Sequence, residues 1–176
     1  MRIVGPPSMT LANVNHALAK LTATPLFTAH IVPELWKWGI ALTIDPVGAI
    51  AQSYKETGKG HFQGKVPDKF YNPCGLKIKY PSIVEGTGGD ETLAHQMFPS
   101  WEVGCLAQIQ HLRAYAGWEL PEDMINVDPR YEWVIGNHAC AHFHELGGKW
   151  APSLSYGTEI ESIMVRIITL GQDYRE

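Results

Sequence analysis

Apolar residues recur every three or four positions in several parts of the chain, and this spacing predicts amphipathic α-helices. The first run follows the polar residues Ser8 and Thr10 and contains Leu11, Val14, Leu18 and Leu21. A second helix can begin at Pro33, because proline suits the first turn of a helix. A further helix is expected after Ser100. The pattern therefore favours a mainly helical domain.

The last helix is expected near Thr158. Thr158 and Glu161 have the spacing of a capping box, in which each side chain bonds a backbone N–H at the start of the helix. Apolar residues continue behind the pair at helical spacing: Ile160, Ile163 and Ile167. We therefore predict a helix near Thr158, with Thr158 and Glu161 as its possible capping box.

A helix is also predicted from Asp45, a good N-cap followed by Pro46, to the glycines at Gly58 and Gly60. Its expected buried stripe consists of Val47, Ile50, Ala51 and Tyr54. Another face carries small or polar residues: Ala49, Gln52, Ser53 and Glu56. Glu56 is thus expected to point away from the core.

The position of Glu56 favours its protonated form. A carboxylate in the last turn lies at the negative end of the helix dipole, and the aromatic-rich sequence that follows predicts a partly dry surrounding. Both effects raise the pKa of a carboxyl group. A general acid needs this property, so Glu56 is the first candidate catalytic residue.

Between Gly60 and Pro99 the composition of the sequence changes, and glycines, prolines and aromatic residues dominate. Short segments here, such as LKIKY, are compatible with β-strands. We expect an irregular lobe or a small hairpin here, carrying substrate contacts. The predicted fold class is mainly α with a minor β part (α+β): one domain over 1–176, two-lobed with a groove between the lobes. It divides into an N-terminal helical part at 1–44 and a core at 45–170.

Composition excludes some classes of partner. The chain has 176 residues, 45% of them hydrophobic, which suits one domain with a substantial core. A formal charge of −4 and the lack of a Lys/Arg cluster argue against nucleic acid as a partner. No apolar run is long enough for membrane insertion, and MRIVGPPSMT does not have the order of a secretory signal. We expect the three cysteines to be buried thiols: Cys74, Cys105 and Cys140. A single disulfide between two of them is the alternative.

Several segments together resemble a known family. AQSYKETGKG followed by YNPCGLK, then GDETLAHQMFPSWEVGCLAQIQHLRAYAG and LGGKWAPSLSYGTEI, are similar to the successive motifs of family 73 glycoside hydrolases, the bacterial and phage endo-β-N-acetylglucosaminidases that cut peptidoglycan. The resemblance covers most of the chain from about Asp45 onward. It implies a lysozyme-like fold, hydrolysis of the bond between N-acetylglucosamine and N-acetylmuramic acid, and no cofactor.

The resemblance makes Glu56 the catalytic acid. A second carboxylate is expected in VEGTGGDETLAHQ, where the candidates are Glu85, Asp90 and Glu91. Asp90 fits the family spacing best, and Glu91 is the next choice. The second group would hold a water, attack the sugar or stabilise positive charge at its anomeric carbon.

Sugar rings stack on aromatic side chains, and amides bind their hydroxyl and acetamido groups. The candidate substrate-binding residues are Tyr71, Asn72, Trp101, Trp150 and Tyr156. The chain departs from the family where Pro73-Cys74 replaces an aromatic residue, and where Trp150-Ala151-Pro152 stands in place of a tyrosine before small residues. Tyr156 is the candidate for the missing hydroxyl.

Three alternatives remain open. NHACAHFHELGG concentrates His138, Cys140, His142 and His144, a donor set that could hold zinc if the segment is extended, as in an N-acetylmuramoyl-L-alanine amidase. A muramidase or lytic transglycosylase would share the lysozyme-like fold and the helix-end glutamate. A non-catalytic wall-binding or phage-tail domain is the third. A wall-degrading enzyme with this N-terminus would reach the wall through phage lysis proteins, on a phage particle, or by means of a leader that has been removed.

Overall fold

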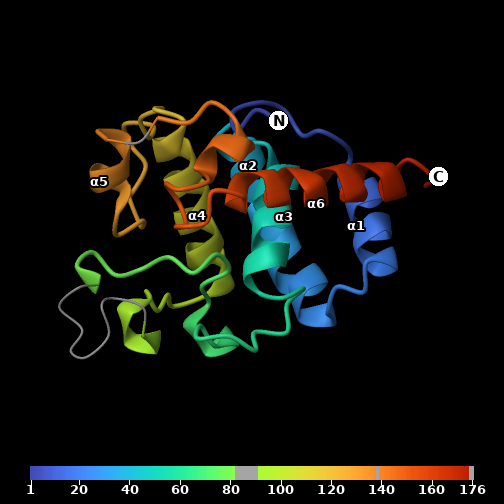
Figure 1. Cartoon of the computed structure of the whole chain (residues 1–176), viewed down its shortest axis with the longest axis horizontal. Helices are drawn as coiled ribbons and strands as arrows, with labels where there is room; N and C mark the ends of the chain where they lie inside the picture. The colour runs from blue at the N-terminus through green and yellow to red at the C-terminus, as the bar shows by residue number, and fades with distance from the viewer. Residues whose placement is uncertain (82–90, 138, 175–176) are drawn as a thin grey trace.

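The computed structural model describes residues 1–81, 91–137 and 139–174 (Figure 1). Within these ranges the chain is mainly helical, as predicted, and forms no β-strand. The α-helices are α1 (Leu11–Lys20), α2 (Val32–Ala41), α3 (Pro46–Glu56), α4 (Trp101–Tyr115), α5 (Tyr131–Ile135) and α6 (Tyr156–Gly171). Shorter π or 3₁₀ turns are η1 (Phe27–Ile31), η2 (Asp68–Phe70), η4 (Thr92–Ala94) and η5 (Phe143–Leu146). None of the described helices is long and apolar enough to cross a membrane.

Helix α3 lies in the middle of the helical body. Helix α6 packs across it and also contacts α1, while α2 packs between α3 and α4 (Figure 1). Helix α5 lies against α4 at the far end of the body. The irregular segment that follows α3 runs along one edge of this body and leads back into α4 (Figure 1).

The prediction for α3 is confirmed at both ends. The Asp45 side chain accepts a hydrogen bond of 3.0 Å from the backbone N–H of Val47, and the helix ends at Glu56. The expected polar face is nevertheless buried, since every residue from Pro46 to Tyr54 lies in the interior. The reason is that α2, α4 and α6 enclose the helix, whereas the sequence pattern suggested a helix with only one covered side.

Glycines allow close packing at two crossings. A Cβ on Gly48 of α3 would lie 2.1 Å from the ring of Phe143, so the ring fills the space above this glycine. A Cβ on Gly104 of α4 would lie 1.8 Å from the backbone oxygen of Tyr71, which brings the irregular segment directly onto the helix. Such contacts leave no room for a larger residue.

The last helix begins near Thr158 as predicted, but the expected capping box does not form. Helix α6 begins at Tyr156. The Thr158 hydroxyl donates a hydrogen bond of 2.7 Å to the backbone oxygen of Ser155. Glu161 bonds the amino group of Met1 and His144 instead of capping the helix. Tertiary contacts therefore use the glutamate that the local pattern assigned to a capping box.

The irregular segment is held by a short stretch of backbone pairing and by side-chain bonds. Its described part contains one isolated antiparallel bridge, between Lys77 and His95. The Asn72 amide donates to the backbone oxygens of Leu76 at 2.8 Å and Gln96 at 2.9 Å. A small apolar cluster lies beneath the segment and comprises Cys74, Leu76, Phe98 and Ala107. All three cysteines are buried and free of disulfides.

Candidate active site

A cavity of about 960 Å³ opens beside the C-terminal end of α3. Its walls come from three parts of the chain: the end of α3 with the segment after it, Arg130 ahead of α5, and the loop between η5 and α6. The described lining residues that matter below are Glu56, Gly75, Lys65, Lys77, His95, Arg130, Lys149 and Trp150. Residues distant in sequence thus meet around Glu56.

Glu56 is exposed to this cavity at the last position of α3. The surrounding protein removes solvent from its carboxyl group and thereby raises its pKa above the ordinary value of 4.5. A hydrogen bond from Tyr156 and the charge of Lys55 act in the opposite direction but do not cancel this effect. Lys55 is itself held by Glu159 at 2.6 Å.

Tyr156 orients the acid. Its hydroxyl donates a hydrogen bond of 2.5 Å to Oε1 of Glu56 and accepts one of 3.1 Å from the Gln52 amide. Because Oε1 is occupied, the other oxygen, Oε2, is the one available to carry a proton. It faces Gly75, where an added Cβ would lie 3.7 Å from Oε2. Gly75 has a φ of +68° and leaves this side of the carboxyl group open.

A buried amide chain sets the direction of the Tyr156 hydroxyl. Gln108 Nε2 donates to Gln52 Oε1 at 2.9 Å and to the backbone oxygen of Ala49 at 3.0 Å. Gln108 Oε1 accepts from Ser53 at 2.7 Å. Since the Gln52 amide group must then donate to Tyr156, the Tyr156 proton is left to bond Glu56. The polar face of α3 is therefore the support of the candidate acid.

The expected second carboxylate cannot be placed, because Glu85 and Asp90 lie outside the described residues. Glu91 is described and exposed, and it does not line the cavity. Its backbone oxygen lies 2.8 Å from Nδ1 of His95, which does line it. Among the described lining residues, Glu56 is the single carboxylate.

The predicted aromatic residues divide into two groups. Trp150 lines the cavity, with its ring 4.6 Å from His111 and 5.5 Å from Tyr115 between centroids. Tyr71 and Trp101 pack against one another at 5.3 Å and are not among the described lining residues. Among the predicted aromatic residues, Trp150 is thus the one placed to stack on a sugar.

Two other predicted binding residues hold the protein framework. Asn72 reaches the cavity wall, but its amide bonds Leu76 and Gln96, and its Oδ1 accepts from the Leu76 N–H at 3.0 Å. Tyr156 is 3% exposed, so its ring offers no face to a ligand. Its hydroxyl acts on Glu56 instead.

The structure adds basic residues that the sequence reasoning missed. Lys65, Arg130 and Lys149 join Lys77 in lining the cavity. They are scattered over some 85 positions of a chain with a net negative charge, so no local pattern marks them. Gln52 and Gln108 were also missed as supports of the acid, because a buried glutamine has no distinctive spacing.

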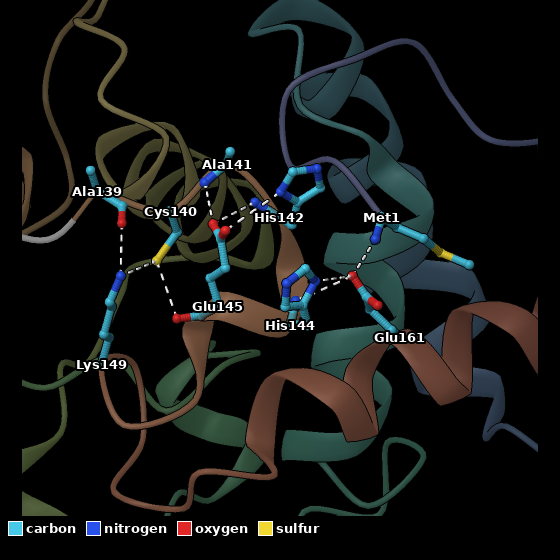
Figure 2. A network of polar contacts seen from close by, with 9 residues as sticks. All are labelled: Met1, Ala139, Cys140, Ala141, His142, His144, Glu145, Lys149 and Glu161. Atoms are coloured by element: carbon cyan, nitrogen blue, oxygen red, sulfur yellow. Dashed lines mark hydrogen bonds and ion pairs between the residues drawn. The ribbon is translucent and has the colours of Figure 1, made fainter.

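The side chains of the histidine-rich segment make several separate contacts (Figure 2). Lys149 donates to the Sγ of Cys140 at 3.4 Å, whereas the rings of His142 and His144 stack at 5.4 Å. His144 Nδ1 lies 3.2 Å from Glu161. His138 lies outside the described residues. Among those described, no three His, Cys, Asp or Glu side chains converge as a metal site would require.

Comparison with protein-family models, curated protein sequences and solved structures found no match. A carboxyl group with a raised pKa, one oxygen anchored and the other open, is arranged to give a proton to a bound oxygen atom.

Proposed function

We propose that this protein is a peptidoglycan hydrolase that cuts the glycan strand as an endo-β-N-acetylglucosaminidase, with Glu56 as the general acid. The observation that carries the proposal is the raised pKa of Glu56 at the cavity, together with the 2.5 Å bond from Tyr156. The choice of peptidoglycan as the substrate rests on the sequence motifs around Glu56 and their resemblance to those of family 73 glycoside hydrolases. We also propose that the helical body and the irregular segment form the two lobes of a lysozyme-like fold.

The proposed reaction begins with protonated Glu56. Oε2 gives its proton to the glycosidic oxygen as the bond from that oxygen to the anomeric carbon breaks, which leaves an oxocarbenium-like sugar. Glu56 then becomes negatively charged. Tyr156 stabilises this charge, because its hydrogen bond to Oε1 is stronger when the acceptor is ionised. The geometry thus stabilises the state that follows proton transfer.

A second group must complete the hydrolysis by directing water to the anomeric carbon or stabilising its charge. Asp90 remains our proposal for this group, with Glu91 as the next choice. The neutral variants Asp90→Asn and Glu91→Gln separate them, because the variant that removes the group should lose most turnover. Full activity in both would assign the role to the acetamido group of the substrate.

Mass spectrometry of digested peptidoglycan tests the proposal. Purified sacculi are incubated with the full chain and the products reduced with borohydride. Reduced glucosamine ends support the proposed bond, reduced muramic acid ends indicate a muramidase, and free peptides indicate an amidase. No release of fragments would favour a wall-binding or phage-tail protein.

A lytic transglycosylase is the second candidate. It is favoured by one observation: Glu56 is the sole carboxylate among the described residues of the cavity lining. A transglycosylase needs only one residue that acts first as the acid and then as the base. A second group to direct water is not required, because a hydroxyl group of the substrate attacks in place of water and closes a ring. Anhydro-muramic acid in the same digest would establish this activity. In either case we propose that the protein acts at the bacterial wall, after phage-mediated release or on a phage particle.

A further inference from the structure

A second, smaller cavity of about 130 Å³ lies beside the one that contains Glu56. The two cavities share Gly75, Lys77, Arg130, Lys149 and Trp150. Three of these shared residues are basic, so positive charge is concentrated where the cavities meet. The feature is unexpected in a chain with a formal charge of −4.

Arg130 is held in place by an aromatic ring. Its guanidinium group lies 4.5 Å from the ring centroid of Trp133, a cation–π arrangement that restricts the long side chain. Arg130 forms no salt bridge with any residue of the described ranges. Its charge is therefore not neutralised by a described carboxylate.

Lys149 is fixed by a different set of contacts (Figure 2). Its ammonium group donates to the backbone oxygen of Ala139 at 2.8 Å and to the Sγ of Cys140 at 3.4 Å. Burial raises the pKa of the Cys140 thiol, which keeps this sulfur neutral. Within the described part of the chain, Lys149 also has no carboxylate in a salt bridge, so no described carboxylate neutralises its charge.

The aromatic wall between the cavities is supported as well. His111 Nδ1 lies 2.7 Å from the buried Asp128, and the His111 ring meets Trp150 edge-on at 83°. This support keeps Trp150 beside the basic residues. A ligand in the combined cavity would meet an aromatic ring and basic side chains next to each other.

We infer that Arg130 and Lys149 form a subsite for a carboxylate carried by the glycan strand, beside the sugar that stacks on Trp150. The inference rests on the proposed function, because it identifies the part of the substrate that separates peptidoglycan from neutral chitin. Muramic acid provides such a group in two ways: as its free lactyl carboxylate in a naked strand, or as carboxylates of an attached peptide. Guanidinium and ammonium groups bind both.

Binding measurements with Glu56→Gln test the subsite, since this variant of the full chain should hold ligands without cutting them. Titration calorimetry would compare three tetrasaccharides: alternating glucosamine and muramic acid without peptides, the same strand with peptides, and neutral chitotetraose. We expect Arg130→Gln and Lys149→Gln, each added to Glu56→Gln, to weaken binding of the acidic ligands roughly tenfold to a hundredfold. Binding of chitotetraose should not change, which also shows that the variants fold.

Arg166→Gln and Lys69→Gln are matched controls, because both residues are exposed and lie outside the cavity lining. Loss with the naked strand would assign the subsite to the lactyl carboxylate, and loss only with the peptide-bearing strand to the peptide. Equal loss for acidic and neutral ligands, or no loss for either acidic ligand, would overturn the inference. Charge-dependent binding without cleavage by the wild type would support the subsite while refuting the proposed hydrolysis. Cleavage by Arg130→Gln at the wild-type KM would refute the subsite alone.

Discussion

The Tyr156 hydroxyl donates a hydrogen bond of 2.5 Å to Oε1 of Glu56, from a residue 100 positions further along the chain. The contact joins the start of α6 to the end of α3. Burial of Tyr156 raises the pKa of its own phenol well above the usual value, so the hydroxyl remains a donor. Desolvation remains the larger influence on the pKa of Glu56, and Tyr156, which does not itself face the cavity, partly opposes it by stabilising the ionised carboxylate.

Glu56→Gln should abolish cleavage of the glycan, because the amide has a similar shape but cannot donate the catalytic proton. We expect turnover to fall by roughly 10²–10⁴-fold. Release of soluble muropeptides measures it. Glu159→Gln is a suitable control, as this exposed carboxylate contacts Lys55 and lies outside the cavity lining. Near-normal release by Glu56→Gln would refute the assignment of the acid.

The same variant should change stability with pH. The pKa of Glu56 is raised in the folded protein, so the unfolded chain loses this proton more readily and ionisation of Glu56 opposes folding. Above the raised pKa, Glu56→Gln should therefore melt at a higher temperature than the wild type. Below pH 4.5 both states of the wild type are protonated, and the difference should disappear. Thermal unfolding across pH measures this effect, and a wild type that melts higher at neutral pH would contradict it.

Tyr156→Phe should shift the pH profile of the reaction. Because the lost hydrogen bond stabilises ionised Glu56, its removal raises the pKa of Glu56 further. The alkaline limb of kcat should then move to higher pH, while kcat at the optimum falls roughly tenfold. Tyr174→Phe, at a distant exposed position, serves as the control. A limb that stays in place or moves to lower pH would show that Tyr156 does not govern the acid.

Gln108→Met should destabilise the protein although it keeps the side-chain volume. The change leaves Ser53 and Gln52 without the partners that they bond at 2.7 Å and 2.9 Å. We expect the free energy of unfolding to fall by about 2–4 kcal/mol. Denaturant titration measures it, with the exposed Gln63→Met as a comparison. Equal stability in the two variants would mean that the amide chain contributes little.

Gly104→Ala should displace the irregular segment from α4. The new Cβ would lie 1.8 Å from the backbone oxygen of Tyr71, and a backbone atom cannot rotate away as a side chain can. The expected loss of unfolding free energy is about 1–3 kcal/mol. Gly136→Ala adds the same group where nothing lies within 4 Å, so it should leave stability unchanged. Similar melting temperatures for the two variants would disprove the close approach.

Local sequence signals predicted the helices well and their surroundings poorly. Asp45 caps α3 and a helix follows Ser100 as expected, because such start signals depend on a few neighbouring residues. Thr158 failed as a cap because Glu161 is engaged by Met1 and His144, which are distant in sequence. Capping motifs cannot anticipate a competing tertiary partner.

In the candidate site, too, the sequence revealed residues in contiguous motifs but not residues that the fold brings together from distant positions. Glu56 was found because its helix end and following motif are contiguous, and Trp150 was found as an aromatic of the terminal motif. Arg130 and Lys149 were not, because their meeting across the cavity depends on how α5 and the loop before α6 pack against α4 and α3. Asn72 and Tyr156 carry polar groups that a ligand could have used, but the fold uses them first.

Helix α3 is enclosed from Pro46 to Tyr54 and reaches the cavity only in its last turn. The candidate acid is consequently carried by an enclosed helix, while most of the cavity wall comes from loops. Laboratory evolution of this protein should therefore find altered ligand preference in the loops and find replacements within the helix almost always inactive. Preference and reactivity would then be separately adjustable traits of one small domain.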